Sequence, residues 1–184
     1  MTQLANLAVG VDLTSGDVLV AGPDELGASC RAGIDRPVWL ARKLGASLHV
    51  MTSLDVDAVA EDLIAKEHLR TGNSLLDSAA SALEVLVGPT RAAGPRITTE
   101  VVFGRPSRVL VEDAARNRRD LVVVGANHRG TRQDTRPAPR LLRHCPVPLW
   151  IARTGGGESV RAVLSAVDHG DTATDVGDVA FAPA

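Results

Sequence analysis

The sequence predicts an α/β fold, with a doubly wound, mostly parallel sheet of five strands and helices on both of its faces. Short apolar runs of strand length alternate along the chain with longer segments in which apolar residues return every three or four positions. Chains with this alternation form parallel sheets, because each helix carries the chain back to the start of the next strand. The 184 residues are 45% hydrophobic, which is enough for one domain with its own core.

Two short apolar runs early in the chain are expected to be strands. Leu7–Val11 is the first, and it ends at Asp12, where a glycine-containing loop begins. Its continuous apolar character is typical of a strand that is buried on both faces. Ser47–Met51 is the second run.

Ser29–Leu44 is expected to form a helix between these strands, since its apolar residues have helical spacing. Lys43 and Gly45 provide a signal for the end of this helix. Pro37 lies inside the range, and proline favours the first turn of a helix. The alternative is therefore a shorter helix that begins near Pro37, with Asp35 as its N-cap.

The middle of the chain is expected to contain a long helix, a strand and a second helix. Asp55–Val87 has apolar residues at mixed spacings of three and four, although Gly72-Asn73 can interrupt it. Ile97–Phe103 alternates apolar and polar residues, which predicts a strand with one exposed face. Ser107 follows a turn and is expected to cap a helix over Arg108–Asn117.

Residues 120–153 carry information on both the fold and a site. Leu121–Val124 predicts a strand, and Gly125 follows it as a turn. A basic, proline-containing loop then leads to a short helical turn at Leu141–His144 and a last strand at Pro148–Ala152. The loop follows the carboxyl end of a strand, which is where ligands bind in open α/β sheets.

Composition and charge exclude several classes of function. The formal net charge is −2, so no basic excess points to nucleic acid or to an anionic membrane surface. Aromatic residues make up 2%, which argues against stacking of single-stranded nucleic acid. No signal-type segment is present and no apolar run approaches the roughly 18 residues of a membrane span, so a cytoplasmic protein is expected. Cys30 and Cys145 form no Cys-x-x-Cys motif and are expected to be reduced thiols.

A short internal repeat bears on the number of domains. Residues 7–12 read LAVGVD and residues 163–168 read VLSAVD, so each is an apolar strand that ends in Val-Asp. A glycine-rich linker precedes the second copy. The alternative is chance similarity between two apolar strands. The expected organisation is one full domain, a linker and the truncated start of a second domain, at residues 1–153, 154–159 and 160–184.

Several blocks of the sequence resemble the universal stress proteins. They read LAVGVDLTSG, LARKLGASLHVM, GRPSRVLVEDA, DLVVVGANHRG and LLRHCPVPLWIAR, and the resemblance spans Leu4–Arg153. The last block, with the glycine-rich linker and the fresh apolar strand after it, is most similar to the first domain of an E-type tandem universal stress protein. The resemblance implies an adenine nucleotide alpha hydrolase-like fold and a role in the stress response.

ATP-binding members of that family carry Gly-x2-Gly-x9-Gly-Ser/Thr after the fourth strand, where backbone N–H groups close on phosphate. Gly125 matches the first glycine, but His128 stands in place of the second. The final pair falls at Thr135-Arg136, and the loop is a few residues short. Pro137 and Pro139 also remove two backbone donors from the anion-binding turn. The phosphate cradle is therefore expected to be degraded.

The resemblance assigns the other candidate residues of a nucleotide site. Asp12 matches a position that contacts adenine or ribose, and Val50 matches an apolar residue of the adenine pocket; either residue can instead be purely structural. The arginines of the loop can supply charge to a phosphate, or they can simply form a solvated basic loop. The candidate set for ATP or AMP is Asp12, Val50, Gly125, His128, Arg129, Gly130, Thr135 and Arg136.

No set of residues predicts catalysis or a metal site. His144 and Cys145 are adjacent, and adjacent side chains rarely face each other across a pocket as a nucleophile and its base must. The chain is therefore expected not to be an enzyme. None of the histidines shows metal-ligand spacing: His49, His68, His128, His144 and His169.

The sequence therefore predicts a non-enzymatic, cytoplasmic module for binding or signalling in the stress response, with an unidentified signalling partner. The edge strand at Leu149–Arg153 is expected to pair two copies in a homodimer, because an exposed apolar edge needs a partner. The alternative is an ATP or AMP sensor with weak or no hydrolysis. A third candidate, a relative of the electron-transfer flavoproteins, shares the fold but needs a cofactor loop that the sequence lacks.

Overall fold

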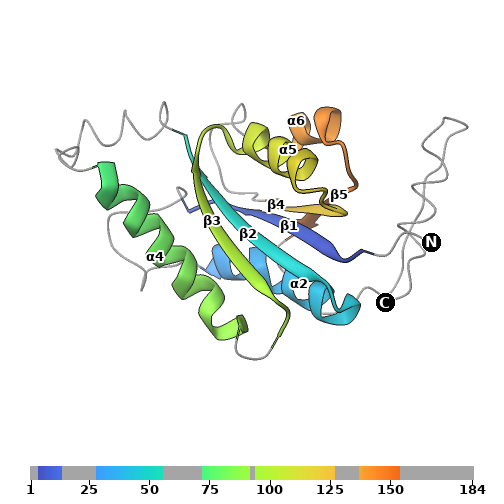
Figure 1. Cartoon of the computed structure of the whole chain (residues 1–184), viewed down its shortest axis with the longest axis horizontal. Coiled ribbons are helices and arrows are strands. Elements are labelled where there is room, and N and C mark those ends of the chain that lie inside the picture. The colour runs from blue at the N-terminus through green and yellow to red at the C-terminus, as the bar shows by residue number, and fades with distance from the viewer. Residues whose placement is uncertain (1–3, 14–27, 56–71, 92–93, 127–136, 154–184) are drawn as a thin grey trace, which may run out of the picture.

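The computed structural model describes residues 4–13, 28–55, 72–91, 94–126 and 137–153. This part of the chain forms one sheet of five strands, all parallel, in the order β3-β2-β1-β4-β5 (Figure 1). The strands are β1 Asn6–Val11, β2 Ser47–Leu54, β3 Ile97–Phe103, β4 Leu121–Ala126 and β5 Leu149–Arg153. The helices are α2 Ala28–Leu44, α4 Gly72–Arg91, α5 Pro106–Arg116 and α6 Pro137–His144. The predicted doubly wound α/β fold is confirmed.

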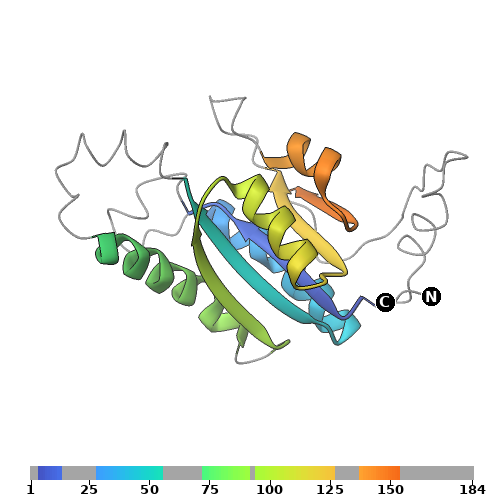
Figure 2. The same cartoon turned by 45° about the horizontal axis from the view of Figure 1, so that its top comes forward.

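Helices cover both faces of the sheet (Figure 2). α2 and α4 pack on one face, over an apolar cluster that includes Leu48 and Leu83. α5 and α6 pack on the other face, over a cluster that includes Ala8 and Leu141. β1 and β4 are neighbours, but the helices that follow them lie on opposite faces. The boundary between β1 and β4 is therefore the topological switch point of the sheet.

The central strands are apolar on both sides because both faces are covered. In β1, Leu7 and Val9 face the α2 side and Ala8 faces the α5 side, and all three are fully buried. Gly10 lets α5 approach the strand closely, since a Cβ on this residue would lie 2.7 Å from Leu110 Cδ1. The packing of α5 on β1 thus depends on a glycine.

α2 contains Pro37 in its interior, so the alternative of a shorter helix that begins there is wrong. Asp35 also lies inside the helix and is not its N-cap. An interior proline removes one backbone hydrogen bond. Ile34 and Val38, on either side of Pro37, are buried in the core, and this packing holds the helix together across the lost bond.

The end of α2 follows the predicted glycine signal. Gly45 has a φ of +64°, a left-handed conformation that glycine adopts without steric cost. The Ala46 N–H donates to the Ala41 carbonyl at 2.9 Å, which is the long bond of a Schellman motif. The chain then turns directly into β2 at Ser47.

β2 and α4 differ from the sequence prediction. β2 runs to Leu54 rather than to Met51, and pairing with β3 holds its last residues. α4 spans Gly72–Arg91 and therefore continues four residues beyond the predicted end at Val87. Of the predicted helical region Asp55–Val87, residues 56–71 lie outside the described residues.

Two helices begin at prolines. α5 begins at Pro106, with Arg105 at the N-cap position and without a side-chain cap bond. The prediction that Ser107 caps this helix is therefore wrong, because Ser107 lies in the first turn. Proline is favoured at the first helical position, since its φ is already helical and its missing N–H has no partner to lose there. α6 likewise begins at Pro137, one turn before the predicted Leu141.

Among the described helices, none is long and apolar enough to cross a membrane. The predicted linker and truncated second domain, residues 154–184, lie outside the described residues. The domain boundaries therefore stay predictions.

Candidate functional site

At the switch point, two of the predicted site residues lie on the same end of the sheet, where the strands finish. Asp12 directly follows β1 and is exposed, and Gly125 near the end of β4 is also exposed. β1 and β4 are parallel neighbours. Both residues therefore lie at the carboxyl ends of their strands, which is where open α/β sheets bind ligands.

Gly125 lies within β4, so the turn predicted at this residue is wrong. It pairs with Ala152 of β5, and the ladder continues to Ala126. A Cβ built on Gly125 would meet nothing within 4 Å among the described residues. Among the described residues, the backbone at Gly125 therefore has open space beside it.

Val50 lies in the middle of β2, not at the end of the strand as the sequence suggested, because β2 continues to Leu54. It is 0% exposed and packs in the core on the α2 side. It pairs with Val9 on one side and Thr99 on the other. Its burial favours the purely structural alternative, and its contact with a ligand stays a prediction.

The Thr52 hydroxyl, which the sequence did not indicate as a site residue, lies near the carboxyl ends of the same strands. Thr52 is 0% exposed, and its Oγ1 has no hydrogen-bond partner in the described part of the chain. It lies two residues beyond Val50 on the same side of β2 and pairs with Val11, the residue before Asp12. A buried hydroxyl without a partner is destabilising. Threonine is common in strands, so the sequence offered no signal for this role.

The remaining candidate residues lie outside the described residues: His128, Arg129, Gly130, Thr135 and Arg136. The structure shows how the chain resumes after them. α6 begins at Pro137, and Pro139 falls in its first turn. Helix N-termini bind phosphate through backbone N–H groups, and neither proline has one. The helix that ends the predicted cradle therefore lacks two donors.

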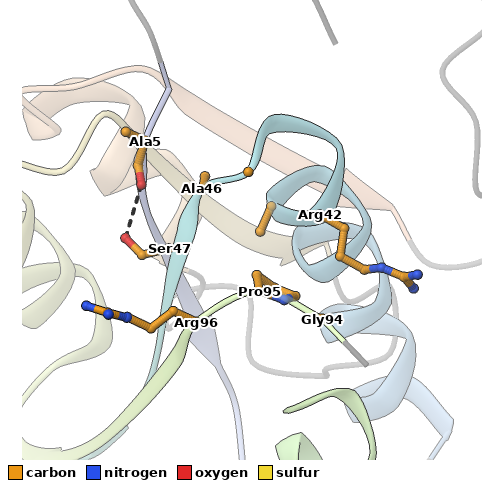
Figure 3. A pocket seen from close by; sticks show the side chains of 9 residues that line it. Ala5, Arg42, Ala46, Ser47, Gly94, Pro95 and Arg96 are labelled. Atoms are coloured by element: carbon orange, nitrogen blue, oxygen red, sulfur yellow. Dashed lines mark hydrogen bonds between the residues drawn. The ribbon is translucent and has the colours of Figure 1, made fainter. Parts of the chain in front are cut away.

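A hollow of about 550 Å³ lies at the other end of the sheet, beside the amino ends of the strands (Figure 3). Its lining includes Arg42, Ser47 and Arg96. The two guanidinium groups lie on opposite sides of the hollow, and the Ser47 hydroxyl donates to the Ala5 carbonyl at 3.0 Å. Since these polar groups do not converge, the hollow is not a second candidate for a nucleotide site.

A buried ion pair joins α5 to the amino ends of β1 and β4. Asp113 accepts two bonds from Arg119, at 2.8 Å from Nε and 2.9 Å from Nη2. Asn117 donates a third bond to Asp113 at 2.7 Å, and Arg119 also donates to Asn6 Oδ1 at 2.8 Å. Burial would raise the pKa of Asp113, but the bonds from Arg119 and Asn117 outweigh it and hold this pKa below its usual value. The pair is a structural tie between helix and sheet.

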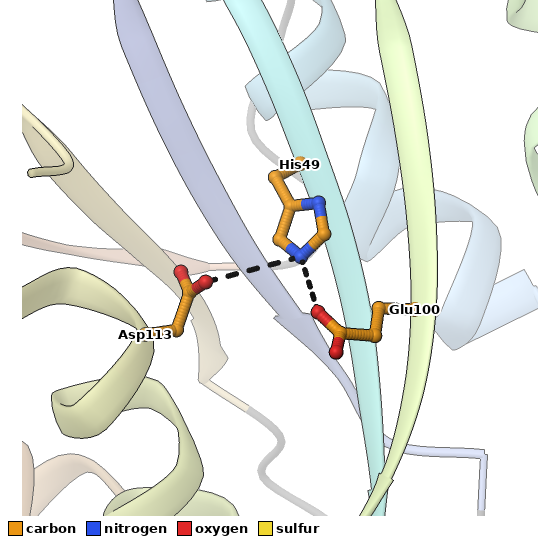
Figure 4. Close-up of side chains that lie close together, drawn as sticks. All are labelled: His49, Glu100 and Asp113. Atoms are coloured by element: carbon orange, nitrogen blue, oxygen red, sulfur yellow. Dashed lines mark hydrogen bonds and ion pairs between the residues drawn. The ribbon is translucent and has the colours of Figure 1, made fainter. Parts of the chain in front are cut away.

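His49 extends this ion pair toward the edge strand β3 (Figure 4). Its Nδ1 lies 2.8 Å from Thr98 Oγ1, and its Nε2 lies 3.1 Å from Glu100 Oε2 and 4.0 Å from Asp113 Oδ1. The His49 side chain is 10% exposed, whereas that of Glu100 is 51% exposed. The cluster is thus buried beneath α5 and opens to solvent on the β3 side. Its members come from β2, β3 and α5, so spacing along the sequence could not reveal it.

Cys145 lies at the end of α6 and has the environment of a structural thiol. It is half-buried, and burial raises the pKa of its thiol. A raised pKa keeps the thiol protonated and therefore weakly nucleophilic. The neighbouring His144 is exposed.

The chain is similar in fold to several solved structures. Universal stress protein UspA from Lactobacillus plantarum is 18% identical, with a TM-score of 0.57 over 83% of this chain and 100% of that protein. The universal stress protein from Archaeoglobus fulgidus in complex with dAMP is 16% identical, with a TM-score of 0.55 over 82% and 98%. A universal stress protein family protein from Arabidopsis thaliana with AMP bound is 16% identical, with a TM-score of 0.53 over 84% and 97%.

No curated protein matches the chain. The resemblance to the first domain of an E-type tandem protein stays a prediction. The model of the universal stress protein family, by contrast, matches residues 20–153, which include every described strand except β1. The chain therefore belongs to the universal stress protein family.

Proposed function

We propose that the chain is a non-enzymatic binding and signalling module of the stress response, with a degenerate nucleotide site. The start of α6 is the observation that carries this proposal. The helix follows the loop that should cradle phosphate, and it begins with Pro137 and Pro139 in its first turn. His128 also replaces a glycine in that loop. The cradle has lost a glycine and two backbone donors, so no measurable binding of ATP or AMP is expected. A cytoplasmic location remains the prediction made from the sequence.

The same proposal includes a homodimer in which β5 pairs with a second copy. Among the described residues β5 pairs with β4 alone, so it lies at an edge of the sheet. Trp150 and Ile151 make this edge apolar. The opposite edge, β3, presents Thr98 and Glu100 at its surface, and a charged edge discourages pairing. Leu149–Arg153 is therefore the edge at which association is expected.

Among the described residues, no strand pairs with the side of β5 that faces away from β4. The Val122 N–H donates to the Pro148 carbonyl at 3.0 Å. In a parallel ladder, successive residues of a strand point their N–H groups to opposite sides. The N–H of Ile151 therefore lies on the side of β5 away from β4, where a second copy would pair.

Calorimetry with ATP and AMP tests the degenerate site, on the unaltered chain and on Asp12→Ala. Asp77→Ala is the matched control, because it removes an exposed carboxylate from α4. The proposal predicts no heat of binding at millimolar nucleotide for any of the three proteins. Micromolar binding that Asp12→Ala weakens and Asp77→Ala leaves unchanged would contradict it.

The second candidate function is an ATP or AMP sensor with weak or no hydrolysis. Two structures of similar fold contain dAMP and AMP, which supports an adenine nucleotide as the ligand. In this chain Asp12 and Gly125 lie at the carboxyl ends of neighbouring strands, and the Thr52 hydroxyl nearby has no hydrogen-bond partner among the described residues. The positively charged loop arginines would then bind the phosphate in place of the backbone N–H contacts that the lost glycines allowed.

Thr52→Val distinguishes the two candidates. The hydroxyl has no partner among the described residues, so if no ligand uses it either, its replacement by a methyl group of similar shape removes an unsatisfied buried group and raises the melting temperature. If the chain is a sensor, the same variant weakens nucleotide binding. The degenerate site therefore predicts a more stable variant with no change in calorimetry.

A further inference from the structure

The cluster of His49, Glu100 and Asp113 lies on the α5 face of the sheet and belongs to neither the predicted nucleotide site nor the β5 edge. One nitrogen and two carboxylate oxygens, one atom from each residue, lie within 4.8 Å of one another. We propose that this cluster binds a divalent transition-metal ion. Imidazole and carboxylate are both ligands of Zn²⁺, which makes Zn²⁺ the ion best matched to this set.

His49 presents a suitable nitrogen to the two carboxylates. Thr98 Oγ1 lies 2.8 Å from Nδ1, while Nε2 faces Glu100 and Asp113 (Figure 4). A histidine that binds a metal donates its other N–H to an oxygen, and this bond fixes the ring. The Thr98 hydroxyl can accept that N–H when an ion is bound, and it can donate to Nδ1 when Nε2 carries a proton instead. The same pair of side chains therefore suits both forms.

Asp113 is held in place before any ion arrives. Arg119 and Asn117 together donate three hydrogen bonds to its carboxylate. A carboxylate offers about four acceptor positions. These bonds occupy both positions on Oδ1, the oxygen 4.0 Å from His49 Nε2, and one on Oδ2, so the position that remains for an ion is on Oδ2. Carboxylates that bind metals are commonly oriented by outer bonds of this kind. Asp113 is therefore a rigid ligand, in contrast to Glu100.

Glu100 provides both the second carboxylate and the access route. Its side chain is 51% exposed, so it can adjust its position around an ion and an ion can reach it from solvent. With neutral His49, the carboxylates of Glu100 and Asp113 and the guanidinium of Arg119 sum to a charge of −1. Because Arg119 offsets one carboxylate, we expect weaker binding than at a closed four-ligand structural zinc site. A fourth position would be left for water.

Binding at this cluster would join three elements. The ligands come from β2, β3 and α5, and an ion would tie the edge strand to a helix whose main contacts with the sheet are to β1, β2 and β4. An ion that binds only the folded chain stabilises it in proportion to its occupancy. The proposal therefore predicts that Zn²⁺ raises the melting temperature.

The test is titration of the tag-free full chain with Zn²⁺, followed by calorimetry and by thermal unfolding. His49→Gln and Glu100→Gln each remove one ligand. Thr98→Val keeps all three ligands but removes the outer partner of His49. His144→Gln, which removes an exposed histidine from α6, is the control for adventitious binding at the surface.

The expected result is saturable Zn²⁺ binding by the unaltered chain, with a higher melting temperature. His49→Gln and Glu100→Gln should abolish both effects, and Thr98→Val should weaken the affinity about tenfold. His144→Gln should bind as the unaltered chain does. Co²⁺ in place of Zn²⁺ should give visible absorption bands that the ligand variants lack.

Two results would overturn the proposal. The first is no binding by the unaltered chain at millimolar Zn²⁺. The second is an affinity that is unchanged in the ligand variants, or that only His144→Gln reduces. If His49→Gln does not fold, the exposed residues Glu100 and Thr98 decide the question, because their substitution leaves the core intact. No nucleotide enters the measurement, so its outcome is separate from that of the proposed function.

Discussion

Replacement of Arg119 by methionine tests how strongly the buried ion pair stabilises the domain. The side chains of Arg119 and Asp113 are 10% and 5% exposed. Arg119 also donates to Asn6 of β1, so it ties α5 to the sheet. Methionine keeps an apolar stem but removes the guanidinium. The variant therefore leaves a buried carboxylate without its counter-charge.

The size of the expected loss follows from the geometry of the pair. Removal of one partner of a buried ion pair costs about 3–5 kcal/mol, because the other charge is left uncompensated. Asn117 still donates to Asp113, at 2.7 Å in the unaltered chain. We therefore expect the lower end of the range, a loss of about 3 kcal/mol in the free energy of unfolding. Domains have total stabilities of about 5–15 kcal/mol, so the variant should fold but be marginal.

Urea unfolding at neutral pH, followed by circular dichroism, measures this loss. Arg108→Met is the matched control, because Arg108 lies on the same helix, is 78% exposed and pairs with Glu112 one turn away. Exposed pairs of this kind contribute little, so the control should unfold as the unaltered chain does. A loss below about 1 kcal/mol for Arg119→Met would refute the reasoning, since that is the range of surface pairs.

Three further predictions follow from the described contacts. The pKa of Asp113 is lowered in the folded chain, so its charged carboxylate stabilises the fold above the unfolded pKa of about 3.9, and this stabilisation is lost as the pH falls through the folded pKa. The urea midpoint of unfolding should therefore drop in acid, and it should drop less for Asp113→Asn. Gly10→Ala places a Cβ 2.7 Å from Leu110 Cδ1 and should destabilise by about 1 kcal/mol or more in thermal unfolding. Gly33→Ala in α2, whose Cβ meets nothing within 4 Å among the described residues, should stabilise by up to about 1 kcal/mol, and equal effects would contradict the packing argument. Ile151→Pro removes an outward N–H from β5 and should sediment as a monomer, while Ile151→Val should remain a dimer; a dimeric Ile151→Pro would exclude β5 as the interface.

The strands and the fold class could be predicted because their patterns are local. Ile97–Phe103 was predicted with the bounds that β3 has, since its alternation of apolar and polar residues reflects one covered face. The run at Leu7–Val11 is apolar throughout because both faces of β1 are covered, and it too was predicted to within a residue. Element order then favoured a parallel sheet, which the structure confirms.

Other features could not be predicted because packing between distant elements decides them. Pro37 is a signal for the first turn of a helix, but the burial of its neighbours keeps it in the interior of α2. Gly125 reads locally as a turn, yet pairing with β5 keeps it in the strand. The neighbours of Thr52 and His49 lie far along the chain. Neither the Thr52 hydroxyl, which lacks a partner among the described residues, nor the cluster of His49 with Glu100 therefore has a local signature.

The residues of the candidate nucleotide site stay a prediction, although the fold explains where some of them lie. Asp12 and Gly125 come together because β1 and β4 are neighbours, a pairing that the sequence does not state. Val50 was assigned by resemblance alone, and its full burial favours a structural role. The prolines at the start of α6 were predicted to weaken the cradle, and the structure places both in the first turn of the helix.

The most direct test of the degenerate nucleotide site is to denature the chain, purified without added nucleotide, and to quantify released adenine nucleotide by ion-pair chromatography. A site that retains phosphate would carry its ligand through purification or would be filled by soaking in ATP before desalting. The account predicts no release of ATP or AMP from either sample, because His128 lacks the conformational freedom of the glycine it replaces, and Pro137 and Pro139 have no backbone N–H to donate. Release of one nucleotide per chain would contradict it and would make the chain a nucleotide sensor.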